Sequence, residues 1–327
     1  MASHHSGPAR FHALTECGEA RLIFAGNNPR PWTRKRRENS AHQMTRTITR
    51  RQALKTLAAG GSGALALGLY TWRVEPHWLQ LTYPRLPVAG LPQELAGRTL
   101  AQISDVHAGP QVADTYLVES FRRVQELAPD FVVVTGDWIT YRNSRQFEQL
   151  RRVLEHLPRG RLATIGILGN HDYGWHWRME DVAERVSQIV RATGITLLRN
   201  EAFSVSGLQF IGLDDLWGLH FDPAAVLAQR GQDPSTIVLC HNPDAADSPV
   251  WGRYQGWILA GHTHGGQCKP PFLPPPLVPV KNKRYIAGEV ALSENRRMYI
   301  SRGVGHLLQV RFNARPEIPI FRLERAS

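Results

Sequence analysis

The sequence predicts an α/β sandwich, formed as one domain from about residue 75 to the C-terminus. Short apolar runs alternate with longer amphipathic stretches, no repeat of fixed period is visible, and polar clusters follow five of the apolar runs. Apolar runs bounded by polar loops are typical of buried strands, and amphipathic stretches are typical of helices packed on a sheet. A chain of 327 residues, 42% hydrophobic, is long enough to bury its own core.

The expected elements follow in chain order. Buried strands are predicted at residues 99–104, 131–135, 163–168, 236–240 and 257–260. Helices are predicted at residues 116–128, 145–156 and 178–192. Residues 203–205 and 208–213, joined by Ser206-Gly207, predict a hairpin with a tight turn. Further strands are expected at 298–301 and 318–323, and the proline-rich residues 269–279 must form a loop.

The N-terminal part differs from the rest in composition. Residues 1–43 are rich in Arg, His, Pro, Gly and Asn without an apolar period, so we expect them to be disordered or untranslated, with Met44 as an alternative start. Arg50-Arg51 then precedes an uncharged stretch, residues 56–72, dominated by Ala, Gly and Leu. This order resembles the twin-arginine export signal of bacterial proteins.

A basic cap before a core helix is the alternative for this segment, but Gly60, Gly61 and Gly63 argue against a stable helix in water. The 17 apolar residues lie near the lower limit for spanning a bilayer. Residues 44–72 are therefore expected to be an export signal, and both cleavage and retention as an anchor remain open.

The net charge of +11 lies mainly in this leader. Residues 1–55 hold eleven Lys/Arg and three Glu, a net charge of +8, which leaves only +3 for the remainder. A nucleic-acid partner is therefore not expected. Cys17, Cys240 and Cys268 are too dispersed for a disulfide framework or a zinc–thiolate site, and Cys240 is expected to be a buried strand residue.

Metal-binding residue types follow each of the five predicted strands. The clusters are Asp105 and His107, then Gly136-Asp137, then Gly169-Asn170-His171-Asp172, then His241, and finally Gly261-His262 with His264. Because sites form at the carboxyl ends of strands in α/β sheets, these loops should converge on one crevice. Each cluster alone is weak evidence, but five together, three of them with a glycine that permits a sharp turn, predict a site.

Taken in order, Asp-x-His, Gly-Asp, Gly-Asn-His-Asp, His and Gly-His-x-His resemble the calcineurin-like metallophosphoesterase superfamily over about residues 98–325. Residues 261–267, 301–305 and 311–317 resemble its exported branch of small bacterial phosphodiesterases. The resemblance implies two facing mixed β-sheets flanked by helices, a four-layer αββα sandwich.

The resemblance also implies a role for each site residue. One metal would be held by Asp105, His107, Asp137 and His264, and the other by Asp137, Asn170, His241 and His262. Asp137 would bridge them, since each of its oxygens can bind one cation. The nitrogen and oxygen donors suit Mn, Fe, Zn or Co better than calcium. Two such cations, about 3.5–4 Å apart, would activate water as hydroxide for attack on phosphorus.

His171 is the implied general acid for the leaving group, and Asp172 would hold its ring and raise its pKa. A turn-capping role is the alternative for Asp172. The sequence departs from the family where a further acid usually follows the Gly-Asp pair, because Trp138-Ile139-Thr140 stands there. That acid usually lies outside the metal shell, so the ligand set is unaffected.

The sequence indicates less about the residues that would bind the substrate. The loop 269–279 begins five residues after His264, and with Trp175 and Trp177 it could form an apolar wall for a lipid; the alternative is a rigid loop packed on its own domain. Arg302, Arg311 and Arg315 could bind phosphate or form structural ion pairs.

Two functions of different class are therefore expected. The first is a monomeric phosphodiesterase or pyrophosphatase, exported by the twin-arginine machinery to the periplasm or the outer face of the cytoplasmic membrane. Its candidate substrates are phospholipids and UDP-2,3-diacylglucosamine. The second is a noncatalytic metal-binding envelope protein. The presence of every ligand together with His171 favours the enzyme.

Overall fold

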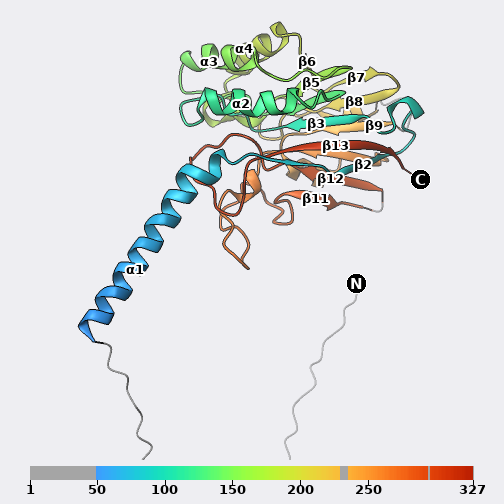
Figure 1. The fold of residues 1–327 in the computed structure, drawn as a ribbon. Helices are drawn as coiled ribbons and strands as arrows, with labels where there is room; N and C mark the ends of the chain where they lie inside the picture. The colour runs from blue at the N-terminus through green and yellow to red at the C-terminus, as the bar shows by residue number, and fades with distance from the viewer. Residues whose placement is uncertain (1–48, 229–234, 294, 327) are drawn as a thin grey trace, which may run out of the picture. The chain divides into compact units, whose positions relative to one another are not determined.

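The computed structural model describes residues 49–228, 235–293 and 295–326, in which two β-sheets pack face to face (Figure 1). The first sheet has the order β1 (Gln80–Thr82), β13 (Glu317–Arg325), β3 (Thr99–Ile103), β4 (Phe131–Thr135), β5 (Ala163–Ile167), β6 (Thr196–Leu197), with β2 (Arg85–Val88) also paired to β13. Strands β3 to β6 are parallel, whereas β13 runs antiparallel to β3.

The second sheet has the order β11 (Gly288–Ala291), β12 (Arg296–Ile300), β10 (Gly256–Ala260), β9 (Thr236–Leu239), β8 (Leu208–Gly212), β7 (Glu201–Val205). Its four inner strands are parallel and its two outer strands, β7 and β11, are antiparallel to their neighbours. Both sheets are mixed, which confirms the predicted fold class.

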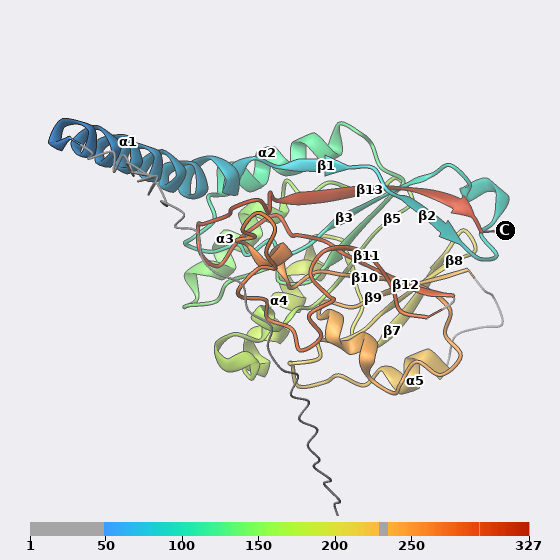
Figure 2. The ribbon, with the colours of Figure 1, turned by 90° about the horizontal axis from the view of Figure 1, so that it is seen from below.

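Helices cover the outer faces of the two sheets. The helices α2 (Asp114–Gln125), α3 (Arg145–Leu154) and α4 (Glu180–Ala192) share one core cluster with the first sheet. On the second sheet the cover consists of α5 (Pro223–Ala228) and the short helix Pro243–Asp247 (Figure 2). Cys240 is buried in this second outer layer, as predicted.

Strand β4 shows why the predicted strands are continuous apolar runs. Phe131 and Val133 belong to the core between the sheets, whereas Val132 and Val134 belong to the core beneath the helices. All five of its residues are buried, since parallel strands covered on both faces have no solvent side. Phe131 of the first sheet and Phe210 of the second meet across the interface, with ring centroids 5.5 Å apart.

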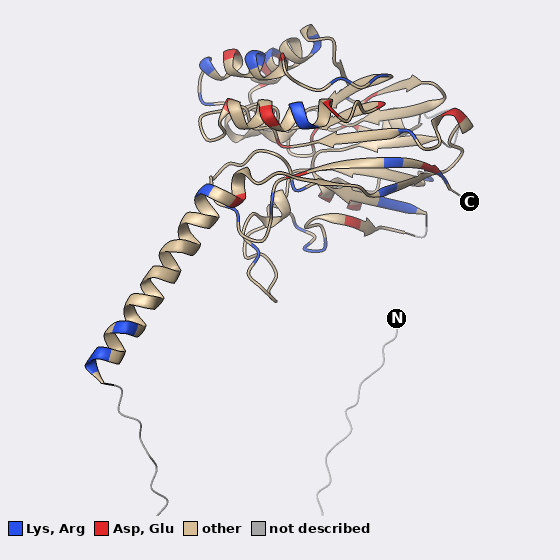
Figure 3. Cartoon of the chain, in the orientation of Figure 1, with Lys and Arg blue, Asp and Glu red and all other residues tan. Residues whose placement is uncertain are grey.

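The N-terminal segment forms a helix that the sequence did not predict. The helix α1 (Arg50–Leu69) continues through Gly60, Gly61 and Gly63, although glycines count against a stable helix in water. Each glycine costs about 1 kcal/mol relative to alanine, but the intervening Ala and Leu residues are strong helix formers. No residue of α1 is buried, and the segment between Lys55 and Arg73 is uncharged (Figure 3).

The predictions for residues 1–43 and for Met44 lie outside the described residues. Among the residues that the structure describes, no helix combines the length and the apolar character needed to cross a bilayer.

The contact between the sheets leads to a stability prediction. Phe210→Ala should lower the free energy of unfolding by about 3–5 kcal/mol, because it removes a buried ring and leaves a cavity. Phe272→Ala is the matched control: its side chain is exposed, so its effect should stay within about 0.5 kcal/mol. Chemical denaturation of both variants measures this, and equal effects would contradict the assigned core.

Candidate metal centre

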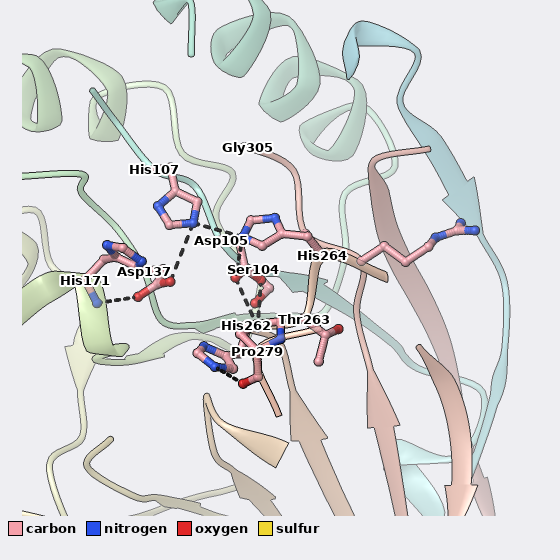
Figure 4. A network of polar contacts seen from close by, with 12 residues as sticks. Ser104, Asp105, His107, Asp137, His171, His262, Thr263, His264, Pro279 and Gly305 are labelled. Atoms are coloured by element: carbon pink, nitrogen blue, oxygen red, sulfur yellow. Dashed lines mark hydrogen bonds and ion pairs between the residues drawn. The ribbon is translucent and has the colours of Figure 1, made fainter. Parts of the chain in front are cut away.

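The loops after the central strands of both sheets meet at one edge of the sandwich. The Asp105 amide donates to the Gly136 carbonyl at 3.0 Å, and the His107 amide donates to the Asp137 carbonyl at 2.9 Å. Across the two sheets, the His262 amide donates to the Asp105 carboxylate at 3.0 Å (Figure 4). The predicted convergence of strand ends therefore occurs.

Six of the predicted ligands form two groups. The potential ligand atoms of Asp105, His107 and His264 lie within 4.8 Å of one another, and those of Asp137, His241 and His262 do the same. Asp137 lies between the groups: its Oδ2 is 3.1 Å from His241 Nε2 and 3.5 Å from His107 Nε2. This carboxylate is therefore within reach of both groups.

Asn170, the seventh predicted ligand, is fully buried beside Asp137. Within the described part of the chain, neither its Oδ1 nor its Nδ2 has a hydrogen-bond partner. A buried amide without partners costs free energy, roughly 1–3 kcal/mol for each unpaired group. A divalent cation next to the amide oxygen would offset that cost, so the side chains here fit a metal ion.

Most of the predicted ligands share an unfavourable backbone conformation. Asp105, His107, Asp137, His262 and His264 all adopt left-handed conformations, with φ between 50° and 72°. Residues other than glycine rarely do so, and such strain persists where the surrounding structure imposes it, often at functional sites. Five of the seven predicted ligands are therefore held in orientations that an unconstrained chain would avoid.

Hydrogen bonds fix which ring nitrogens face the centre. The Nδ1 of His241 lies 2.7 Å from the Thr135 carbonyl, and the Nε2 of His262 lies 3.0 Å from the Pro279 carbonyl. A carbonyl can only accept, so these nitrogens carry protons. When the rings are neutral, the opposite nitrogens, His241 Nε2 and His262 Nδ1, carry the lone pairs, and these atoms lie 3.3 Å apart. This is the usual orientation of metal-binding histidines.

The ionisable side chains of the two groups change one another's pKa values. Burial raises the pKa of Asp105 to about 6. Burial would also raise the pKa of Asp137, but the charges of His241 and His171 hold it well below its ordinary value. Conversely, burial would lower the pKa of His241, and the Asp137 carboxylate raises it well above that of a free histidine. The centre therefore attracts positive charge.

His171 lies at the opening of this centre. Its amide donates to Asp137 Oδ1 at 2.8 Å, and its half-buried ring meets the His107 ring edge-on at 5.1 Å. Asp172 was expected to hold this ring, but both of its oxygens are used elsewhere. They accept the amides of Gly169 and Trp138 at 2.8 Å and of Ile139 at 3.2 Å.

Among the described residues, no hydrogen bond joins the Asp172 carboxylate to the His171 ring, so the predicted orienting role is not the one that the structure gives it. The expected rise in the pKa of His171 is wrong as well, because burial of the ring lowers that pKa. Asp172 instead caps the turn and ties two site loops together. Trp138, where the family has a further acid, buries its indole and donates to the Ile167 carbonyl at 2.7 Å. Thr140 of the same segment supports a predicted ligand, since its hydroxyl lies 3.0 Å from His107 Nδ1.

A cavity of about 720 Å³ adjoins the two groups. Polar residues of the centre line it, including Asn170, His171, His262 and His264. Apolar side chains line it as well: Trp177, Trp217, Leu277, Val278, Leu308 and Val310. Trp177 and the end of the 269–279 loop thus contribute to an apolar wall, whereas Trp175 borders a different hollow.

Two functional candidates were missed by the sequence reasoning. Asp215 and Trp217 follow β8, whose end lies at the same edge of the second sheet as the ends of β9 and β10. The Trp217 ring stacks on Trp177 at 4.6 Å and meets His262 edge-on at 4.5 Å. Asp215 accepts the Trp217 amide at 2.8 Å, and burial raises its pKa to about 7. The rule that sites follow strand ends, extended to β8, would have found both.

The arginines take structural roles. Arg311 is fully buried and donates to the carbonyls of Arg302 at 2.9 Å, Gly305 at 2.7 Å and Ala314 at 2.8 Å. Burial lowers its pKa to about 10. Arg302 pairs with Glu317 at 2.9 Å. Arg315 lies over the Trp78 ring at 3.9 Å. Among the described residues, the expected structural ion pair is found only for Arg302, whereas Arg311 is held by carbonyls and Arg315 by an aromatic ring.

Known proteins resemble this chain over most of its length. The sequence profile of the calcineurin-like phosphoesterase family matches residues 98–266. The phosphodiesterase YaeI of Escherichia coli is 31% identical, over 84% of this chain and 99% of the relative. The metallophosphoesterase YkuE of Bacillus subtilis, described as uncharacterized, is 32% identical over 86% and 99%. The UDP-2,3-diacylglucosamine pyrophosphatase LpxG of Chlamydia trachomatis is 26% identical over 79% and 94%.

The close packing at Gly261 leads to a prediction about metal content. A Cβ at Gly261 would meet the Ser104 hydroxyl and would lie 2.6 Å from Asp105 Oδ2. Gly261→Ala should therefore displace Asp105 and reduce the bound divalent metal from two ions per chain to one or fewer. Gly68→Ala, where a Cβ meets nothing within 4 Å, should keep the full complement. Elemental analysis of the purified variants measures the number of metal ions per chain, and an unchanged metal content in Gly261→Ala would contradict the assigned centre.

Proposed function

Because the chain belongs to the calcineurin-like phosphoesterase family, and is thus a metal-dependent phosphoester hydrolase, we propose that it is a dinuclear phosphodiesterase or pyrophosphatase for a lipid-linked substrate. One observation carries this proposal: two groups of ligand atoms share Asp137 beside an apolar-walled cavity. YaeI is described as a phosphodiesterase and LpxG as a pyrophosphatase, which favours the enzyme over the noncatalytic alternative.

In this proposal Asp105, His107, Asp137 and His264 hold one cation, and Asp137, Asn170, His241 and His262 hold the other. The grouping of six of these side chains and the unpaired amide of Asn170 support it. When bound, two divalent cations polarise the phosphoryl oxygens and make a water molecule more acidic. The mixed nitrogen and oxygen donors suit Mn, Fe, Zn or Co.

His171 is the proposed general acid. Its ring lines the cavity next to the ligand groups, and its amide is tied to Asp137, so that its position is fixed relative to the centre. From there it would protonate the oxygen of the leaving group as the P–O bond breaks. Asp172 acts on this step through the backbone, because it fixes the turn that carries His171.

The apolar wall is the basis for proposing a lipid. Leu277, Leu308 and Val310 line the same cavity as residues of the metal-binding groups, so an acyl chain could contact them while the phosphoester reaches the centre. Each buried methylene would contribute about 0.8 kcal/mol. The relative LpxG is described as acting on UDP-2,3-diacylglucosamine, which has acyl chains near a pyrophosphate, and its likeness to this chain agrees with such a substrate.

We further propose that the protein works outside the cytoplasmic membrane. Arg50-Arg51 and the uncharged helical segment after Lys55 have the order of a twin-arginine signal. In this division, residues 1–43 lie outside the functional protein, residues 44–72 direct export or anchoring, and residues 75–327 form the catalytic domain. Detection of the protein in a periplasmic or membrane fraction, and its loss from that fraction in an Arg50→Lys/Arg51→Lys variant, would test this.

Catalysis can be tested with the general substrate bis-p-nitrophenyl phosphate and added Mn. His171→Ala should lower kcat by about 10²- to 10⁴-fold while keeping the bound metal, because the ring is proposed to donate a proton without binding a cation. Asp137→Asn should lose both activity and metal. If wild type were no faster than either variant, the proposed function would be wrong.

The lipid proposal predicts a dependence on chain length. Leu308→Asn replaces an apolar wall residue that is 70% exposed, so the fold should tolerate it. It should raise the KM for a long-chain phosphodiester about ten-fold more than the KM for a short-chain analogue. Steady-state kinetics on the two substrates measures this ratio, and equal changes in both KM values would remove the role of the wall.

A further inference from the structure

The loop 269–279 carries large apolar side chains that nothing in the described structure covers. Phe272 is fully exposed, with a relative exposure of 105%, and Leu273 and Leu277 are 61% and 81% exposed. Leu308, on a second loop that borders the same cavity, is 70% exposed. Leu277 and Leu308 line the cavity, and Phe272 and Leu273 lie on the same loop as Leu277. We call these four side chains the apolar rim. Clustered exposed apolar residues of this size usually mark an interaction surface.

The loop is held firmly at its base and projects from the body after β10 (Figure 1). The Lys269 amide donates to the Phe312 carbonyl at 2.8 Å. Pro275 is buried against Gly266, and the Pro279 carbonyl accepts from the His262 ring at 3.0 Å. Its prolines restrict the backbone further, so docking of the tip would cost little conformational entropy.

Hydrogen bonds tie the rim to two other segments. The Gln267 side chain donates to the carbonyls of Leu308 at 3.1 Å and Val310 at 3.0 Å, which joins the second loop to the first. The Arg311 amide donates to the Thr71 carbonyl at 2.9 Å, and the Gln309 side chain donates to the Trp72 carbonyl at 3.2 Å. The uncharged segment that ends at Trp72 therefore contacts the loop that carries Leu308.

Basic side chains outnumber acidic ones around the loop. Lys269, Lys281, Lys283 and Arg284 are all exposed, and no acidic residue occurs between residues 269 and 288. The acidic side chains that lie against this stretch are Asp244 and Asp247, which accept hydrogen bonds from residues 281, 282 and 285. Apolar side chains at a tip with basic residues beside them are the combination that binds the headgroup region of anionic membranes, because apolar burial and charge attraction add.

We propose that the apolar rim inserts into the headgroup region of an anionic lipid bilayer, so that the mouth of the cavity opens onto the membrane surface. The inference deepens the proposed function and rests on it, since a lipid-linked phosphoester would then reach the centre without leaving the bilayer. The basic side chains Lys269, Lys281, Lys283 and Arg284 lie against the anionic headgroups.

A fluorescent probe tests insertion independently of catalysis. In full-length protein with Cys17→Ser and Cys268→Ser, Phe272→Cys is labelled with the environment-sensitive dye NBD; Cys240 is buried and stays unlabelled. Vesicles of phosphatidylcholine and phosphatidylglycerol should shift the emission to the blue with a several-fold rise in intensity, and pure phosphatidylcholine should do so more weakly. The control label is Tyr83→Cys, 66% exposed and beside Thr99 at the opposite end of β3 from the metal centre.

No spectral change at position 272, whether or not the protein sediments with the vesicles, would overturn the proposal. An equal change at position 83 would overturn it as well, because it would indicate general adsorption. Both results are obtained from the NBD fluorescence alone, even if the protein hydrolyses no phosphoester.

A kinetic comparison separates docking from catalysis. Phe272→Ser/Leu273→Ser should hydrolyse a vesicle-embedded phosphodiester about ten-fold more slowly than wild type and soluble bis-p-nitrophenyl phosphate at the wild-type rate. Tyr83→Ser/Leu127→Ser, which removes two exposed apolar residues at the opposite end of the sheet, should match wild type on both. Equal rates of Phe272→Ser/Leu273→Ser and wild type on vesicles would contradict docking, whereas a wild type inactive on both substrates would contradict the proposed function instead.

Discussion

The structure depends on holding two buried carboxylates, Asp105 and Asp137, at the edge where two β-sheets meet. Both are inaccessible to solvent, and burying such groups is costly unless hydrogen bonds, histidines or cations compensate. The fold provides these partners because strand ends from both sheets converge at one edge, which brings histidines from β9 and β10 against carboxylates from β3 and β4. The left-handed backbone of the ligands is the local cost of this convergence.

The same contacts connect the centre to its surroundings. Pro279 accepts from the ring of His262 and ends the loop that carries Phe272, while Arg311 joins the carbonyls of the 302–305 turn to the end of the N-terminal helical segment. The same residues therefore contact both the metal centre and the loops around the cavity. An apolar wall beside a polar centre matches the lipid-linked phosphoester proposed above, because such a substrate has an apolar part and a charged part.

The central strands and the ligand clusters could be predicted from sequence because both depend on local patterns. Strands such as β4 are buried on both faces and form uninterrupted apolar runs, and the ligands follow those runs directly. The short strands β2 and β6 carry too few residues to show a period, so they were missed. The contacts of Asp172, Asp215 and Arg311 depend on which distant groups lie beside them, and no local pattern specifies that.

The most direct test of the central claim is anomalous X-ray diffraction from crystals grown with Mn. The account predicts two anomalous peaks per chain, one beside Asp105, His107 and His264 and the other beside Asn170, His241 and His262, with the Asp137 carboxylate in contact with both. A single peak, or two peaks of which only one contacts Asp137, would contradict it.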